Sequence, residues 1–170
     1  MEKKFKAFVN NFLSNFNLRL VYLDNYKRII SEINEQSANQ LIHFIKPSLL
    51  NNFVQNIHFS KSQLAQDLFV LSELDFKKKG FFVEFGSTDG VSLSNTFLLE
   101  KKFFWKGILA EPAKEWQKKL NKNRDVFIEK NCIWHSSNKT LTFNQVGELS
   151  TIDDFSYSDM HDKARIKGKR

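Results

Sequence analysis

The chain has 170 residues, enough for one ordinary domain, with 41% apolar and 26% charged residues. This composition argues against collagen-like and disordered proteins, and the single cysteine, Cys132, rules out an intrachain disulfide. The lysines and arginines that give the net charge of +7 are mixed with acids along the chain. Lysine, Phe and Asn are all abundant and share A/T-rich codons. Because no nucleic-acid motif accompanies this charge, we expect no nucleic-acid partner.

Nothing at the amino terminus predicts export or insertion into a membrane. No apolar stretch approaches the roughly 20 residues that a spanning helix needs. The basic start is followed by a segment that Asn10, Asn11, Ser14 and Asn15 interrupt, which is unlike a secretory signal peptide. We therefore expect a cytoplasmic protein.

Residues 1–59 contain no glycine and are predicted to form an amino-terminal helical region. One apolar stripe follows i, i+3, i+4 spacing and consists of Phe5, Phe8, Val9, Phe12, Leu13 and Phe16. Two interpretations stay open. The stripe packs on the rest of the chain or on a partner, or residues 3–16 make peripheral contact with a membrane through lysines at the headgroups. A second helix is predicted over about 24–46, ending near Pro47.

Residues 60–170 follow a different pattern, which predicts an α/β fold. Ser60 and Gln63 have capping-box spacing before a helix that carries Leu64, Leu68 and Leu71. A strand at Phe81–Phe85, a helix near 92–103, a strand at Gly107–Ala110, a helix near 113–122 and a strand at Val126–Ile128 are expected next. This alternation predicts a parallel sheet with right-handed crossovers. Another strand is expected over Lys139–Val146, and a polar loop after it, with Asp153 and Asp154 solvated.

The segment Glu84–Gly90 lies where the first strand ends and the next helix begins. At such a place the chain turns sharply beside any bound ligand. Gly86 and Gly90 allow this turn and a close approach of the backbone. The spacing E-x-G-x-x-x-G differs from the dinucleotide pattern, and the sequence contains no P-loop. The segment therefore favours a nucleoside over a pyrophosphate.

Glu111 follows the second predicted strand, and Pro112 ends that strand. An acid at this position can accept hydrogen bonds from ribose hydroxyls. The glycine turn and Glu111 would then surround one adenosine-type ligand. The alternative is an ordinary glycine turn with a solvated glutamate.

Four blocks in this order resemble the FkbM family of S-adenosylmethionine-dependent methyltransferases. They lie within residues 60–155 and are Ser62–Asp67, Phe82–Gly90, Ser94–Glu100 and Trp105–Pro112. The resemblance implies a Rossmann-like methyltransferase fold, a three-layer sandwich, over residues 60–170. It also implies S-adenosylmethionine as cofactor, and methyl transfer to a hydroxyl of a sugar, that is, to a small-molecule or glycan acceptor.

The resemblance carries cofactor-binding roles to individual positions. Glu84, Gly86 and Gly90, with Ser87 and Thr88 between them, would shape the methionine end of the pocket, and Glu111 beside Pro112 would hold the ribose. Asp89, Ser94 and Asn95 would order the loop or contact the ligand, and Asn131 would lie on the adenine side. The resemblance identifies no catalytic residue in this chain.

Members of the family continue into a second half of the sheet, whereas this chain ends at Arg170. We therefore expect an incomplete domain in which Phe81–Phe85 forms a sheet edge. An exposed apolar edge favours self-association, so we expect a marginal, dimeric or aggregation-prone chain unless the amino-terminal helices cover the edge.

Two other functions stay open beside a methyltransferase. The chain could be a non-catalytic remnant or an interaction module that uses its amino-terminal amphipathic helices, or another nucleoside-binding enzyme of the same sheet class. Cys132 and His135 lack the further ligands of a metal site, so we expect no metal, a buried cysteine and a surface histidine. Trp105 is expected to pack in the core.

Overall fold

The computed structural model describes residues 36–168, so the predicted stripe between Phe5 and Phe16 and residues 24–35 of the second predicted helix lie outside the described residues. A helical stretch at 36–41 leads into η1 (Ile42–Phe44), η2 (Pro47–Leu49), α3 (Leu50–Asn56), η3 (Ile57–Phe59) and α4 (Gln66–Glu73). The described part of residues 1–59 is thus largely helical, as predicted. Helical structure resumes at Pro47, because proline suits the first position of a helix.

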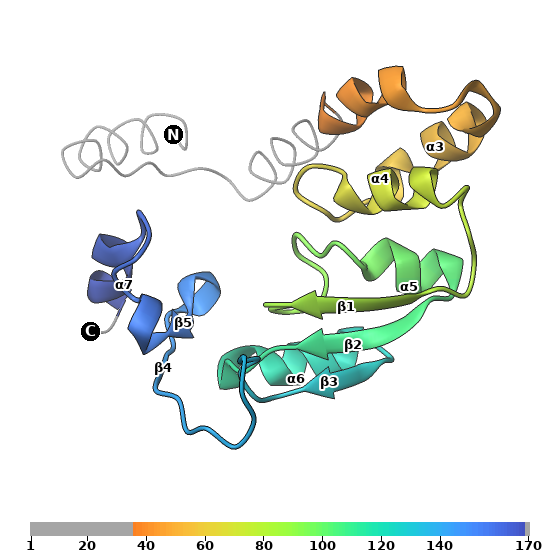
Figure 1. Cartoon of the computed structure of the whole chain (residues 1–170). Coiled ribbons are helices and arrows are strands. Elements are labelled where there is room, and N and C mark those ends of the chain that lie inside the picture. Colours follow the sequence, from red (N-terminus) through yellow and green to blue (C-terminus); the bar gives the residue numbers. More distant parts are fainter. Residues whose placement is uncertain (1–35, 169–170) are drawn as a thin grey trace, which may run out of the picture.

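The predicted alternation of strands and helices is confirmed. It runs through β1 (Phe81–Phe85), α5 (Phe97–Phe103), β2 (Lys106–Ala110), α6 (Lys114–Asn123) and β3 (Phe127–Glu129). The strands are parallel in the order β1-β2-β3, with Val83 opposite Ile108 and Ile108 opposite Phe127. Among the described residues β1 is therefore an edge strand, as expected (Figure 1).

The crossover helices cover one face of this sheet. Right-handed crossovers in a sheet of sequential order place α5 and α6 on the same side. Phe82 and Leu109 point to that side and are buried, whereas Phe81, Val83 and Phe85 alternate with them and are exposed. The molecule therefore has an α/β core on one face of a three-stranded sheet.

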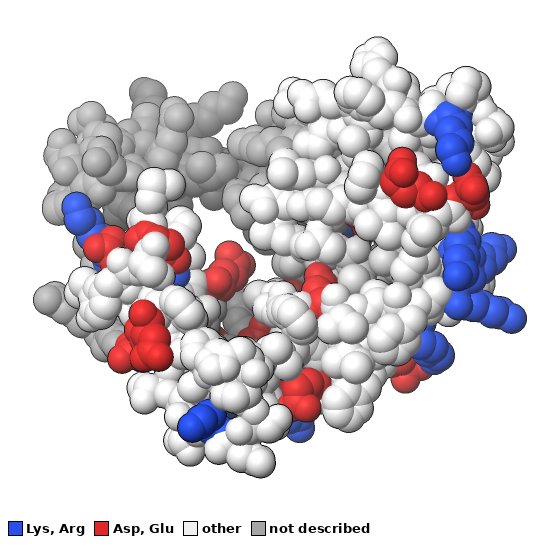
Figure 2. Space-filling model, in the orientation of Figure 1, with Lys and Arg blue, Asp and Glu red and all other residues white. Residues whose placement is uncertain are grey.

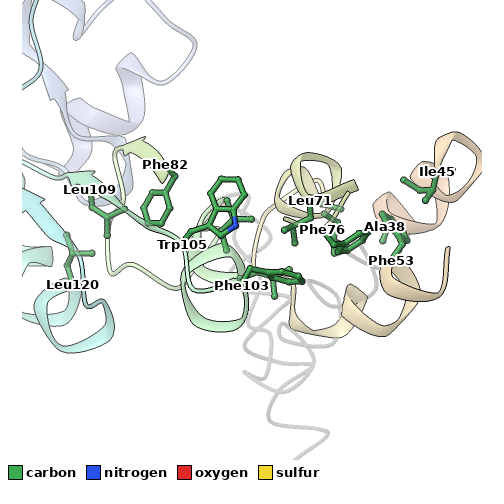
Figure 3. Packing of buried hydrophobic residues seen from close by; sticks show 14 residues of the cluster. Ala38, Ile45, Phe53, Leu71, Phe76, Phe82, Phe103, Trp105, Leu109 and Leu120 are labelled. Carbon is green, nitrogen blue, oxygen red and sulfur yellow. The ribbon is translucent and has the colours of Figure 1, made fainter. Parts of the chain in front are cut away.

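The core continues from the sheet into the preceding helices. Figure 3 shows buried side chains running from Leu120 and Leu109 past Phe82 and Trp105 towards the helices before β1. Trp105 is a packing residue, as expected: it is 5% exposed, and its indole Nε1 donates to the Lys77 carbonyl at 2.8 Å. The helices before β1 and the sheet thus share one core.

The capping box predicted at Ser60 and Gln63 is wrong. Helix α4 begins only at Gln66, after Ala65 in the left-handed region at φ 57°, and Leu64 lies outside it and is exposed. The reason is the buried carboxylate of Asp67, which accepts from the hydroxyls of Ser60 and Ser62 at 2.6 Å each. These bonds hold residues 60–65 in a turn. The two serines therefore donate to a carboxylate within the helix instead of capping the backbone at its start.

The helix predicted near 92–103 is shorter than expected, because α5 begins at Phe97. The carboxylate of Glu84 accepts from the Ser94 hydroxyl, the Asn95 backbone and the Thr96 hydroxyl, which keeps this segment irregular. Side-chain bonds to a strand residue thus replace the first turn of the predicted helix.

The carboxyl-terminal prediction also needs correction. Instead of a strand over 139–146, only β4 (Phe143–Asn144) forms, and it pairs antiparallel with β5 (Thr151–Ile152) in a separate sheet. The expected loop holds η4 (Gly147–Leu149), η5 (Asp153–Phe155) and α7 (Asp162–Gly168). Asp154 is exposed, but Asp153 is half-buried and accepts from the Ser156 hydroxyl.

An arginine gives this polar segment its structure. The Arg165 guanidinium forms a bidentate pair with Asp159 and donates to the carbonyls of Leu149 and Ser156. Its hydrogen bonds lower the pKa of Asp159 to about 2. The sequence predicted a loop whose carbonyl groups would face solvent. In the structure one side chain, that of Arg165, binds two of these carbonyls.

No described helix is both long and apolar enough to cross a membrane.

Any side chain larger than that of Gly107 in β2 is predicted to strain the packing against Phe82. A Cβ at this position would lie 2.4 Å from the Phe82 ring and 2.5 Å from the Phe82 carbonyl oxygen. We expect Gly107→Ala to lower the free energy of unfolding by about 1–3 kcal/mol through overpacking. The neighbouring exposed change Lys106→Ala should stay within about 0.5 kcal/mol. Urea unfolding followed by circular dichroism measures both, and equal stabilities would contradict this account of the packing.

Candidate functional site

A cavity of about 400 Å³ lies where the parallel strands end. Gly86, Glu111 and Asn131, which follow β1, β2 and β3, all line it, and the segment around β4 and β5 forms the opposite wall. Figure 2 shows a central hollow between these two parts of the chain, with acidic side chains around it. The carboxyl ends of parallel strands are where α/β proteins bind ligands, so this cavity is the candidate site.

The lining of the cavity is largely apolar, and the charged residues in it are acidic. Its described walls carry the carboxylates of Glu111 and Glu148 and contain no lysine, arginine or histidine. A wider, open hollow of about 860 Å³ continues past Asn131 and is lined by Lys114, Lys130 and Lys139. The inner cavity therefore suits hydroxyl donors or a cation, and basic side chains lie only outside it.

Glu111 joins the ends of two strands. The side chain is buried, and one carboxylate oxygen accepts from the Thr88 backbone N–H at 2.8 Å while the other accepts from the Ala113 N–H at 2.9 Å. These two hydrogen bonds fix the β1–α5 loop against the start of α6. Each oxygen keeps further acceptor capacity, because a carboxylate offers about four lone-pair sites.

Gly86 opens the floor of the cavity. Its φ of +69° is a left-handed conformation that glycine adopts without a steric penalty, and its N–H donates to the Ala110 carbonyl at 2.9 Å. A Cβ built there would meet no heavy atom within 4 Å. The missing side chain thus leaves space that a ligand can use.

Gly90 has a different role from Gly86. A Cβ at Gly90 would lie 2.6 Å from both Arg124 and Leu120, so this glycine lets the loop pack closely on α6. Between the two glycines, the Ser87 hydroxyl is buried and has no hydrogen-bond partner, but Ser87 does not line the cavity. Only the first glycine of the motif therefore faces the cavity.

Arg124 binds the loop between β1 and α5 on the side away from the cavity. Its fully buried guanidinium donates to Glu100 at 2.6 Å, to the Gly90 carbonyl at 3.0 Å, to Ser94 at 3.1 Å and to Thr96 at 2.8 Å. Its Nη1 also lies 3.8 Å from the Glu84 carboxylate. One cation thus holds α5, α6 and the loop after β1 in a single arrangement.

Two acids in this network have lowered pKa values. Burial alone would raise the pKa of Glu100, but hydrogen bonds from Lys101, from the Asp125 backbone and from Arg124 outweigh it and lower that pKa. Burial likewise opposes ionisation of Asp89. Bonds from the Val91 and Ser92 backbones and the Ser92 hydroxyl nevertheless lower the pKa of Asp89. Both carboxylates therefore stay charged and support the loop.

The residues assigned from sequence fall into two groups. Gly86, Thr88, Glu111, Pro112 and Asn131 line the cavity. Glu84, Ser87, Asp89, Gly90, Ser94 and Asn95 lie behind it; Glu84 and Asp89 have their carboxylates bonded to neighbouring protein groups, and the Asn95 N–H bonds to Glu84. The second group orders the loop, while a cofactor role for the first stays a prediction.

Sequence reasoning missed Arg124 and the far wall of the cavity. The far wall comes from Phe143, Gly147, Glu148, Ser150 and Ile152, which no motif marked. A signal for Arg124 existed: the chain has five arginines beside 21 lysines, so an arginine is unusual here. Its planar fork is the feature that lysine cannot replace.

Cys132 lines the cavity without the features of a nucleophile. The residue is half-buried rather than buried as expected, and His135 is exposed. Burial, aided by the charge of Glu111, raises the pKa of the Cys132 thiol, which keeps it protonated. No group of three metal-binding side chains occurs within residues 36–168.

In comparisons with known proteins, the chain matches no family model, no curated protein and no solved structure. The assignment of a function therefore rests on the geometry of the cavity and on the resemblance of the sequence blocks.

Arg124 is predicted to be the largest single contributor to the stability of the site. Arg124→Met would leave the buried carboxylate of Glu84 without its cation and Glu100 with Lys101 as its remaining ion-pair partner. We expect a loss of about 3–5 kcal/mol in the free energy of unfolding, as for other broken buried ion pairs. Lys122→Met, at an exposed position in the last turn of α6, is the control and should change little. Urea denaturation measures both, and similar losses in the two variants would refute the role of Arg124.

The lowered pKa of Glu100 predicts how stability depends on pH. The unfolded chain binds the proton more readily, so the contribution is fully present above the ordinary pKa of 4.5 and is lost as pH falls through the lowered folded value. Urea unfolding between neutral pH and pH ~3 should show this loss. Glu100→Gln should be less stable at neutral pH and show a shallower acid slope, whereas exposed Glu73→Gln should retain the slope of the native chain.

Proposed function

We propose that this chain binds S-adenosylmethionine in the acidic cavity and belongs to a methyltransferase of the FkbM type that acts on a hydroxyl of a sugar or related metabolite. One observation carries the proposal. Gly86, Glu111 and Asn131, which the resemblance marks as cofactor residues, are far apart in sequence but line one cavity at the carboxyl ends of three parallel strands. The Rossmann-like methyltransferase assignment of the sheet is part of the same proposal.

The cavity fits the proposed ligand in size and charge. Its volume of about 400 Å³ lies within the roughly 300–1,000 Å³ of small-molecule sites. S-Adenosylmethionine supplies a methyl group on a positively charged sulfur, and the two carboxylates in the lining favour a cation. A pyrophosphate would be disfavoured beside the same carboxylates.

Each lining residue has a distinct part in this proposal. Gly86 would leave room for the methionine end, and Glu111 would accept the ribose hydroxyls with the lone pairs that Thr88 and Ala113 leave free. Asn131 would border the adenine, its side chain fixed by a bond to Glu129 at 2.7 Å. The protein would contribute alignment of the methyl group with an acceptor oxygen.

Calorimetric titration of the purified, folded chain tests the proposal. We expect saturable binding of S-adenosylmethionine with Kd on the order of micromolar and no comparable binding of NADH. Tighter binding of NADH would replace the proposal with a dinucleotide enzyme, in which the lysines beyond Asn131 hold the phosphates. Absence of binding by a cooperatively folded chain would overturn it.

Gly86→Asn tests the assigned contact. Asparagine tolerates left-handed backbone well, so the change fills ligand space with little strain. We expect Kd for S-adenosylmethionine to rise at least about tenfold while the thermal midpoint stays near that of the native chain. Lys79→Asn, at an exposed position with a φ of 58° outside the cavity, is the matched control and should bind normally. Equal affinities in both variants would place the ligand elsewhere.

A further inference from the structure

One face of the sheet is apolar and exposed. Along β1 the side chains of Phe81, Val83 and Phe85 are 63%, 52% and 65% exposed, and Phe127 of β3 is 63% exposed. The register sets Val83, Ile108 and Phe127 side by side in one row. We call these residues the open face: Phe81, Val83, Phe85, Ile108 and Phe127.

A parallel sheet with one bare face is unusual. Such sheets occur almost only with both faces covered, since crossover helices supply the layers. Here α5 and α6 cover the side of Phe82 and Leu109, and the described residues leave the other side exposed. Apolar patches of this kind mark a surface that another segment or molecule covers.

We propose that the open face is the docking surface for the amphipathic amino-terminal segment of the same chain, Phe5–Phe16. The apolar residues of this segment follow helical spacing, and Lys3, Lys4 and Lys6 lie at or near the start of the segment. The open face adjoins the cavity at Phe85, which belongs to both. The inference concerns the face of the sheet and requires no cofactor in the cavity.

The dimensions of the segment and the face agree. Twelve residues of helix span about 18 Å, close to the roughly 17 Å of a five-residue strand. Three strands about 4.8 Å apart make a face about 10 Å wide, which is the diameter of one helix. A single helix with a stripe of this length is therefore enough to cover it.

The tether is long enough and favours the same chain over a second copy. The 19 residues between Phe16 and Gln36 reach about 60 Å when extended, whereas a domain of this size has a radius of gyration of about 14 Å. Tethering raises the local concentration of the segment to the order of millimolar. An untethered copy or partner would need to be present at that level to compete.

Charges at the two ends of the face set the direction of docking. Lys106 stands beside Phe81 at the amino end of the strands, and Glu129 stands beside Ala110 at the carboxyl end. The lysines at the start of the segment would then lie near Glu129. The docked helix would run antiparallel to the strands, as the crossover helices of parallel sheets do.

Cross-linking within the full chain tests the docking. In a Cys132→Ser background, Phe12→Cys is paired with Val83→Cys on the open face and treated with a short bis-maleimide at low protein concentration. The control pairs Ser14→Cys with Val83→Cys, since Ser14 lies on the opposite side of the predicted helix. We expect intrachain linkage about tenfold faster for Phe12 than for Ser14, which would point about 10 Å away from the face. Intact mass identifies the linked species.

A second measurement leaves the cysteines untouched. Phe8→Asp combined with Phe12→Asp should increase hydrogen exchange at the β1 amides several-fold without affecting α4, and Ser14→Asp should not. Equal linkage rates and unchanged exchange would overturn the proposal. Linkage between chains would assign the face to a second copy instead. Flotation of the native chain with vesicles of equal parts phosphatidylcholine and phosphatidylserine, abolished by the two Asp changes, would assign the stripe to a membrane and overturn it too.

Discussion

The buried guanidinium of Arg124 is the interaction on which the rest of the site depends. It is fully enclosed, and the groups that it contacts belong to three parts of the fold: Glu100 to α5, Gly90 and Thr96 to the loop after β1, and Glu84 to β1 itself. A cation in such surroundings is tolerated only when its donors are satisfied, so the loop can close on α6 in one way. The bonds to Arg124 thus fix the conformation of the loop on the side away from the cavity. The other side of the loop remains free to line the cavity.

Glu111 plays the complementary part at the cavity itself. By accepting from Thr88 and Ala113, it fixes two strand ends to one another through a carboxylate that still has acceptor capacity. Arg124 and Glu111 together hold the floor of the cavity through hydrogen bonds and ion pairs. Preorganisation of this kind lets a small cavity bind a flexible ligand without first ordering its own walls.

Much of this arrangement could be predicted from the sequence, because its signals are local. Short apolar runs flanked by glycine predicted β1 and β2, and their alternation with helices predicted a parallel sheet. The edge position of β1 was expected from the family resemblance. The residues at strand ends that form the cavity followed from that topology. The predictions that failed involve carboxylates that bind hydroxyl or backbone groups several residues away. Asp67 accepts from the hydroxyls of Ser60 and Ser62, which keeps them out of a helix cap, and Glu84 accepts from the Asn95 backbone in place of the first turn of the predicted helix. The β4–β5 wall failed for a related reason, since strands of two residues have no periodicity to detect.

The enclosed Arg124 also has a genetic consequence. A single-base change turns the arginine codons AGA and AGG into the lysine codons AAA and AAG, a substitution in the direction of the lysine-rich composition of this chain. On a solvated surface such a change keeps the charge and passes unnoticed. At position 124 a lysine ammonium is a single point on a flexible stem, and it cannot bond Glu100, Gly90 and Thr96 at once as the guanidinium does. A substitution that matches the composition of this chain is therefore one that position 124 does not tolerate.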